Sequence, residues 1–224
     1  MTLRTHLTLA ATAICLAAPG ASHAIGITDA TGDWASTYAA AGPRAGDLDV
    51  IGAFVTYNPG NGKFVFSGTM DAAIGTTPNA VYVFGVNRGA GTARFGAAAS
   101  GVLFDAVVVF NPAGTSTVNL FDGNPAQPLT AGAVMSFDST VIGTVAGSML
   151  PSTGFAASAY TWNLWPRAPG IAGVPGIPDF APNNSMVAVT NLSPVPEPGT
   201  WLMLAAGLAV VGAGARRRRV QAGA

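Results

Sequence analysis

Short apolar runs, separated by Gly, Pro, Asn and Asp, recur along the middle of the chain. β-Branched and aromatic residues dominate these runs, and no window of about 11 residues carries a helical stripe. The pattern therefore predicts eight or nine short strands. They lie at residues 50–57, 64–70, 80–86, 102–110, 115–120, 134–138, 140–146, 160–165 and 186–190.

The turn residues between these runs indicate how the strands are joined. Residues 58–62 read Asn-Pro-Gly-Asn-Gly, which predicts a hairpin between the first two strands, and residues 111–114 read Asn-Pro-Ala-Gly. Residues 80–86 and 102–110 are apolar nearly throughout, as in strands buried on both faces. Strands do not alternate with helices, so the pattern predicts an all-β domain, an antiparallel β-sandwich or jelly roll.

The first 24 residues have the layout of a secretory signal peptide. Arg4 supplies a positive start, residues 7–18 are apolar, and Ser22-His23-Ala24 places small residues where a signal peptidase would cut before Ile25. Cys15, the single cysteine, would leave with this segment. We therefore expect an exported protein without disulfides.

The C-terminal 30 residues, 195–224, carry a second targeting pattern. A Pro-Glu-Pro motif is followed by the uncharged apolar run 201–215 and then by four arginines. This order resembles the PEP-CTERM sorting signal of Gram-negative bacteria. The residues that carry the resemblance are Pro196, Glu197, Pro198, Arg216, Arg217, Arg218 and Arg219.

The resemblance implies processing by a membrane-embedded exosortase, with cleavage near the Pro-Glu-Pro motif and delivery to the cell surface. Physical arguments agree with this expectation. Two prolines two residues apart favour an extended segment that an enzyme can grip. A helix over 201–215 would rise about 22 Å, and snorkelling arginines would help it to cross the inner membrane with its C-terminus in the cytoplasm. A plain C-terminal anchor that is never cleaved is the alternative.

Residues 25–194, the predicted ectodomain, contain few chemically reactive side chains. They hold nine Asp and five Lys or Arg, a net charge of about −4, which argues against nucleic acid as a partner. They contain no His and no Cys, so a Ser-His-Asp triad, a Cys-His pair and the usual zinc sites are excluded. A glycosidase that works with two Asp is not excluded, although no spacing nominates a pair.

Four aspartates near the start of the domain suggest a calcium site. Asp29, Asp33, Asp47 and Asp49 are close in sequence, and Ca²⁺ takes six to eight oxygen ligands from carboxylates and backbone carbonyls. A domain without disulfides would gain stability from a bound metal ion. The other interpretation is that these aspartates are turn formers and caps.

Three aromatic residues near the end of the domain suggest a sugar-binding surface. Tyr160 and Trp162 share a face if residues 160–165 form a strand, and Trp165 is nearby. Rings that stack on one sheet face can bind exopolysaccharide. Filling the sandwich core is the other role these rings could have.

Residues 29–181 are also similar to secreted bacterial β-sandwich domains found beside calcium-binding repeats. The shared features are Thr31-Gly32-Asp33, Gly46-Asp47-Leu48-Asp49, Gly75-Thr76-Thr77-Pro78 and residues 160–166, Tyr-Thr-Trp-Asn-Leu-Trp-Pro. This similarity implies an extracellular β-sandwich without a settled activity. The sequence as a whole predicts a non-enzymatic surface or extracellular-matrix protein. A calcium-assisted exopolysaccharide-binding module is the first alternative, and an Asp-based glycosidase is the second.

Overall fold

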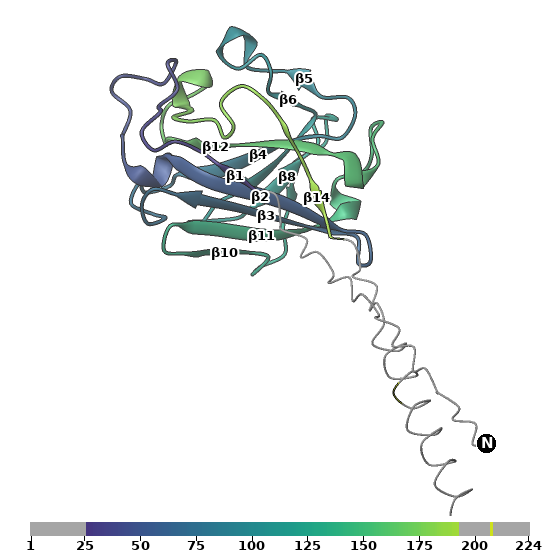
Figure 1. The fold of residues 1–224 in the computed structure, drawn as a ribbon. Helices are drawn as coiled ribbons and strands as arrows, with labels where there is room; N and C mark the ends of the chain where they lie inside the picture. Colours follow the sequence, from purple (N-terminus) through teal and green to yellow (C-terminus); the bar gives the residue numbers. More distant parts are fainter. Residues whose placement is uncertain (1–25, 193–206, 208–224) are drawn as a thin grey trace, which may run out of the picture. The chain divides into compact units, whose positions relative to one another are not determined.

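The computed structural model describes residues 26–192 and Gly207. The predicted signal peptide and nearly all of the predicted sorting signal lie outside the described residues. Residues 26–192 form strands, turns and five single-turn 3₁₀ helices, so the all-β prediction is confirmed (Figure 1). The 3₁₀ helices are η1 (Gly46–Leu48), η2 (Gly96–Ala98), η3 (Gly147–Met149), η4 (Ala157–Ala159) and η5 (Val174–Gly176).

The first hairpin joins β2 (Val50–Asn58) to β3 (Lys63–Met70), within one residue of the predicted bounds. Its turn uses the expected side chains. Asn58 Oδ1 accepts a hydrogen bond from the Gly60 amide at 2.8 Å, and Gly62 has a φ of +63°. Asn side chains that bond to the backbone two residues on, and glycines at positive φ, are what such a turn requires.

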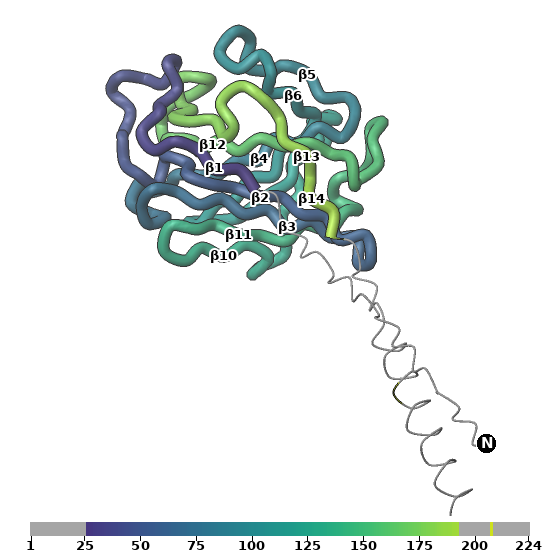
Figure 2. The backbone as a smooth tube through the Cα atoms, in the orientation of Figure 1, coloured from purple at the N-terminus to yellow at the C-terminus, as the bar shows by residue number. Residues whose placement is uncertain are grey.

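Sheet A is built around this hairpin. β11 (Thr140–Ala146) pairs antiparallel with β3, and β10 (Val134–Phe137) pairs antiparallel with β11. On the other side of β2 lie both ends of the domain. β1 (Ile27–Thr28) pairs antiparallel with the first half of β2, and β14 (Thr190–Asn191) pairs parallel with its second half (Figure 2).

Sheet B contains six strands, and three of them form a meander. These are β4 (Val81–Asn87), β7 (Ala106–Phe110) and β8 (Thr117–Asn119). β12 (Thr161–Arg167) returns beside β4, so the order β12-β4-β7-β8 is a Greek key. The short strands β13 (Val187–Ala188) and β9 (Gln127–Pro128) form the two edges. Sheet A instead places the β2–β3 and β10–β11 hairpins side by side, with β1 and β14 beside β2, an arrangement different from the Greek keys of a jelly roll.

Two predicted strands are each divided in the structure. Residues 186–190 contribute to β13 in sheet B and to β14 in sheet A. Residues 102–110 form two strands, β6 (Leu103–Phe104) and β7, which are separated by Asp105. β6 pairs with β5 (Thr92–Ala93) in a separate ribbon, whereas β7 belongs to sheet B. At this break between β6 and β7 the buried Asp105 carboxylate accepts hydrogen bonds from the Arg88 amide and side chain.

The two sheets pack face to face around an aromatic core. Phe66 of sheet A lies 5.2 Å from Phe84 of sheet B, measured between ring centroids. Phe84 in turn lies 5.4 Å from Phe110. A second apolar cluster covers the outer face of sheet B, where segments 95–104 and 177–180 pack on Trp165. This second layer explains why β4 and β7 are apolar on both faces.

Candidate metal centre

Three aspartates from opposite ends of the domain converge at one end of β2. Asp29 follows β1, Asp33 lies in the next turn, and Asp179 lies after η5. One carboxylate oxygen of each lies within 4.8 Å of the others. Asp29 and Asp33 were predicted from the sequence, whereas Asp179 was not, because 150 residues separate it from Asp29 and only the fold places it here.

Backbone hydrogen bonds hold the two chain segments together at this point. The Asp29 amide donates to the Ile51 carbonyl at 3.1 Å, which extends the pairing of β1 with β2. The Ala35 amide donates to the Pro178 carbonyl at 2.7 Å, which fixes the turn after Asp33 against the segment that carries Asp179. The carboxylates are therefore positioned by the fold of the domain.

Asp179 is the most buried of the three, with 1% of its surface exposed. Its Oδ2 accepts a hydrogen bond from the Val50 amide at 2.9 Å, and its Oδ1 accepts one from the Phe180 amide at 2.6 Å. Each carboxylate oxygen has two lone pairs, so both retain capacity for a cation. The bond to Val50 ties this side chain to the first residue of β2.

Two oxygens of the cluster are buried without a donor. Asp29 Oδ2 and Asp33 Oδ1 have no hydrogen-bond partner among residues 26–192. The other oxygens of these side chains are engaged, since Asp29 Oδ1 accepts from the Ala30 amide and Asp33 Oδ2 accepts from Asn183 Nδ2. Buried acceptors without a donor are costly and are rare in native proteins unless a water or an ion satisfies them.

The electrostatics of the cluster also favour a cation. Burial raises the pKa of Asp179 to about 7, and the neighbouring charges of Asp29 and Asp33 add to this rise. Burial likewise raises the pKa of Asp29 to about 6, with further contributions from Asp33 and Asp49. A divalent cation would reverse both effects, because it stabilises the ionised carboxylates.

Asp47 and Asp49, the other two aspartates of the predicted set, are not among the three whose oxygens converge, although the charge of Asp49 contributes to the raised pKa of Asp29. Asp47 is fully buried, and its two oxygens accept hydrogen bonds from the Thr77 amide at 2.6 Å and the Thr77 hydroxyl at 2.7 Å. It therefore ties η1 to the turn before β4. Asp49 Oδ2 accepts a hydrogen bond from the Gly32 amide at 2.6 Å, which orders the turn between Asp29 and Asp33.

The oxygen set suits a hard cation. Ca²⁺ binds oxygens at about 2.3–2.6 Å, so two ligands of one ion are at most about 5 Å apart. The three carboxylates meet that limit. Ca²⁺ also accepts irregular geometry and additional carbonyl or water ligands, whereas Mg²⁺ requires a near-ideal octahedron.

The predicted sugar platform is wrong, because its rings are buried. Trp162 is 0% and Tyr160 1% exposed, and both lie in the core between the sheets. The Tyr160 hydroxyl donates to the Leu150 carbonyl at 2.9 Å. Trp165 is 2% exposed and packs edge-on against Phe95 in the cluster outside sheet B. These rings stabilise the two cores and offer no open face to a sugar.

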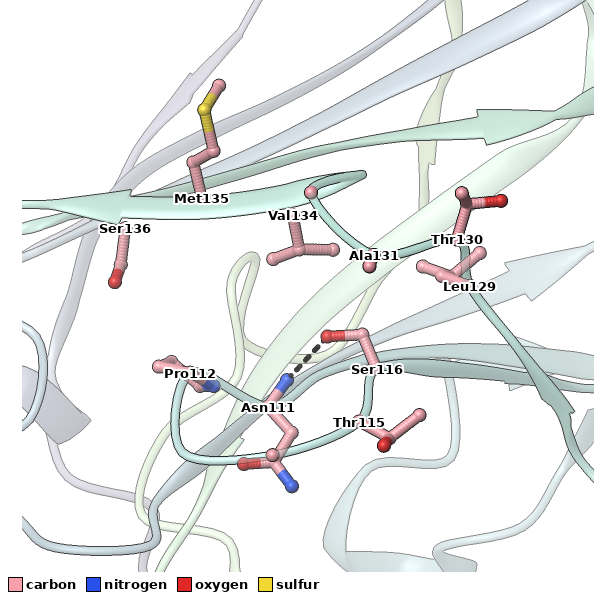
Figure 3. Close-up of a pocket in the computed structure, with 12 residues that line it drawn as sticks. Asn111, Pro112, Thr115, Ser116, Leu129, Thr130, Ala131, Val134, Met135 and Ser136 are labelled. Carbon is pink, nitrogen blue, oxygen red and sulfur yellow. Dashed lines mark hydrogen bonds between the residues drawn. The ribbon is translucent and has the colours of Figure 1, made fainter.

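A pocket of about 280 Å³ lies between the β7–β8 turn and β10 (Figure 3). No charged side chain lines it. The turn is fixed by a hydrogen bond from the Asn111 amide to Ser116 Oγ at 3.0 Å. Val134 and Ser136 point from β10 toward this turn, whereas Met135 points away from it (Figure 3). No charged or reactive residue in these two segments marks the pocket in the sequence.

The comparison with known families identifies one segment. Residues 194–219 match the PEP-CTERM protein-sorting motif. The predicted sorting signal is thereby confirmed, and it implies an exported, surface-sorted precursor that an exosortase processes. No curated protein and no solved structure matches the chain. Within the part of the chain that the structure describes, no helix has the length and apolar character needed to cross a membrane.

Proposed function

We propose that this protein is a non-enzymatic structural protein of the cell surface, with a β-sandwich that binds Ca²⁺. The sorting motif at residues 194–219 supports the surface destination. Two observations support Ca²⁺ binding. Asp29, Asp33 and Asp179 converge, and two of their buried carboxylate oxygens lack a hydrogen-bond donor. The ligands would be these three carboxylates, completed by water or backbone carbonyls.

The position of the centre favours a structural role for the ion. It joins the first segment of the domain to the start of β2 and to the segment after η5. Asp179 is almost fully buried, which suits an enclosed ion better than one that must be open to a substrate. An ion here would hold the two ends of the domain together.

The direction in which the chain leaves the domain fits display at a surface. β14 runs parallel to β2 and ends beside Tyr57, close to the β2–β3 turn. The Asp179 carboxylate bonds to Val50, at the opposite end of β2. Seven residues of strand span about 23 Å. The described part of the chain therefore ends at one end of the sandwich, and the metal centre lies at the other.

Processing of the two chain ends belongs to the same proposal. The signal peptide, residues 1–24, would be removed on export, and the segment 201–215 would anchor the precursor in the inner membrane. Exosortase would then cut near Pro196, Glu197 and Pro198. Mass spectrometry of the protein isolated from the cell surface tests this, with an expected N-terminus at Ile25 and an expected C-terminus close to residue 197. A surface protein that still carries Arg216–Arg219 would contradict the cleavage.

Calcium binding is tested on the full-length chain in detergent. We expect EDTA to lower the melting temperature, and Ca²⁺ to restore it. At a concentration 100 times the Kd, one site stabilises by about 2.7 kcal/mol, or roughly 5–10 °C for a domain of this size. Asp179→Asn should abolish the shift, because a neutral amide replaces the buried carboxylate. The amide oxygen can keep the hydrogen bond from the Val50 amide but the NH2 group cannot accept from the Phe180 amide, so the variant is compared with itself with and without Ca²⁺.

Asp122→Asn is the matched control. Asp122 is exposed and lies outside the centre, where its Oδ1 accepts a hydrogen bond from the Asn124 amide. This variant should keep the full calcium shift. An equal calcium response in the wild type and Asp179→Asn would refute the site. A response to Mg²⁺ as large as that to Ca²⁺ would refute its assignment to calcium.

A further inference from the structure

The four edges of the two sheets differ in how well they are protected from pairing. β13 and β9 have two residues each, and β9 contains Pro128. The outer edge of β2 is divided between β1 and β14, also two residues each. Short strands and prolines are the usual means by which proteins prevent edge-to-edge association. β10, with four residues, is the longest edge strand.

β10 also lacks the charged residues and prolines that commonly protect an edge strand from pairing with another chain. Its sequence is Val-Met-Ser-Phe, with no charge and no proline. Met135 is 61% and Phe137 58% exposed, more than any other large apolar side chain among the described residues. Both point to the outer face of sheet A, because Ser136 between them points inward toward the β7–β8 turn (Figure 3).

The row of residues in register with Met135 carries no charge. Met135 is in register with Ile142 of β11, and Ile142 is in register with Ser67 of β3. Ser67 is in register with Phe54 of β2. Residues in register lie side by side on one face of a sheet. Ile142 and Phe54 are half-buried and Ser67 is buried, so the exposed apolar side chains of this face are concentrated on β10.

We propose that β10 pairs antiparallel with β10 of a second copy of this protein, about a two-fold axis at Ser136. The strand is self-complementary in this register. Ser136 faces Ser136 of the second copy, and Met135 faces Phe137 of the second copy on both sides of the axis. Methionine–aromatic contacts of this kind are favourable. No charge in the strand opposes the pairing, and the two copies of sheet A become one continuous sheet.

The pairing goes beyond the proposed function, since it names the partner, and it does not use the aspartates of the metal centre. A two-fold contact is isologous, so the same strand serves both copies and the assembly closes at a dimer. Failure of calcium binding would leave this proposal intact. Failure of the pairing would leave the calcium site intact.

A disulfide tests the register directly. In the full-length chain with Cys15→Ser, we introduce Ser136→Cys. Residues opposite each other in an antiparallel pair have Cα atoms about 4.5–5.5 Å apart, within the range that a disulfide spans. We expect mild oxidation at micromolar concentration to give a covalent dimer on a non-reducing gel. The matched control is Thr144→Cys in the same background, an exposed residue of β11 that should stay monomeric.

Mass measurement in solution tests the apolar contact. Met135→Lys with Phe137→Lys places like charges opposite each other in the dimer, and we expect the dimer Kd to rise at least tenfold. Phe155→Lys, at another exposed aromatic residue, should leave the Kd unchanged. An unchanged melting temperature in each variant shows that the fold is retained.

Three results would overturn the proposal. The first is a Ser136→Cys chain that stays monomeric while its thiol reacts with maleimide, which would show an open strand. The second is a monomeric chain with an unreactive thiol, which would show that another segment of the same chain covers β10. The third is equal cross-linking of the Thr144→Cys control, which would show non-specific collision.

Discussion

Arg88 and Asp105 form a buried ion pair, with 3.0 Å between Arg88 Nε and Asp105 Oδ1. The same carboxylate accepts hydrogen bonds from the Arg88 and Ala90 amides and from the Thr153 hydroxyl. Arg88 also donates to the Pro151 carbonyl at 2.8 Å. The pair thus joins the end of β4 to the start of β7 and to the loop at residues 151–153.

Asp105→Asn should strongly destabilise the domain. The change removes the charge that compensates the Arg88 guanidinium, which is only 3% exposed. Breaking a buried pair in this way costs about 3–5 kcal/mol. Denaturant unfolding of the full-length chain measures the loss. Asp122→Asn, at an exposed carboxylate, should change stability by less than about 0.5 kcal/mol. Equal losses in the two variants would contradict the structural role of the pair.

Trp165→Ala should reduce the stability of the domain. The ring is 2% exposed and lies 5.1 Å from Phe104 and 6.2 Å from Phe180, between ring centroids. Removing a buried Trp side chain costs about 3–5 kcal/mol. Thermal unfolding measures the effect. A variant as stable as the wild type would mean that the ring is not part of the cluster outside sheet B.

Gly68→Ala should destabilise the interface between the two sheets. A Cβ atom at Gly68 of β3 would lie 2.6 Å from Leu164 Cδ2 of β12 and 3.0 Å from Met70 Cε. Overpacking of this kind costs about 1–3 kcal/mol. Gly68→Ala combined with Leu164→Ala gives space to the new methyl group, so we expect the double variant to lose less than the sum of the single losses. Strict additivity in denaturant unfolding would contradict the contact.

Without calcium, stability should fall as the pH rises from about 4 to about 7. The pKa values of Asp29 and Asp179 are raised in the folded state, to about 6 and about 7, from an ordinary value of 3.8. In this window the folded state binds more protons than the unfolded state, so raising the pH favours unfolding. Saturating Ca²⁺ should reverse the slope, because it binds the ionised carboxylates.

Unfolding measured from pH 4.5 to 7.5, with EDTA or with Ca²⁺, checks this prediction. Asp179→Asn removes the more strongly shifted group, so it should flatten the slope in EDTA. A wild-type slope in EDTA that equals the slope of Asp179→Asn would show that Asp179 does not titrate in this range. The Asp122→Asn variant should behave as the wild type, since its carboxylate is exposed.

The sequence determined the class of fold and most strand positions, because both depend on local chemistry. Alternating and β-branched runs mark strands, and the Asn-Pro-Gly-Asn-Gly turn sets the β2–β3 hairpin within one residue. The sorting motif could also be read directly, since an enzyme recognises it as a linear segment. Exopolysaccharide binding and Asp-based glycoside hydrolysis stay predictions from the sequence.

The tertiary structure alone decided which side chains meet. Asp29, Asp33, Asp47 and Asp49 are neighbours in sequence, yet Asp47 bonds to Thr77 and its place is taken by Asp179. Likewise, the pattern of Tyr160, Trp162 and Trp165 fits either a sugar platform or a core, and only the packing of segments 95–104 and 177–180 on sheet B buries Trp165. The 150 residues between Asp29 and Asp179 are bridged only by how the sheets pair and close, and no local pattern encodes that proximity.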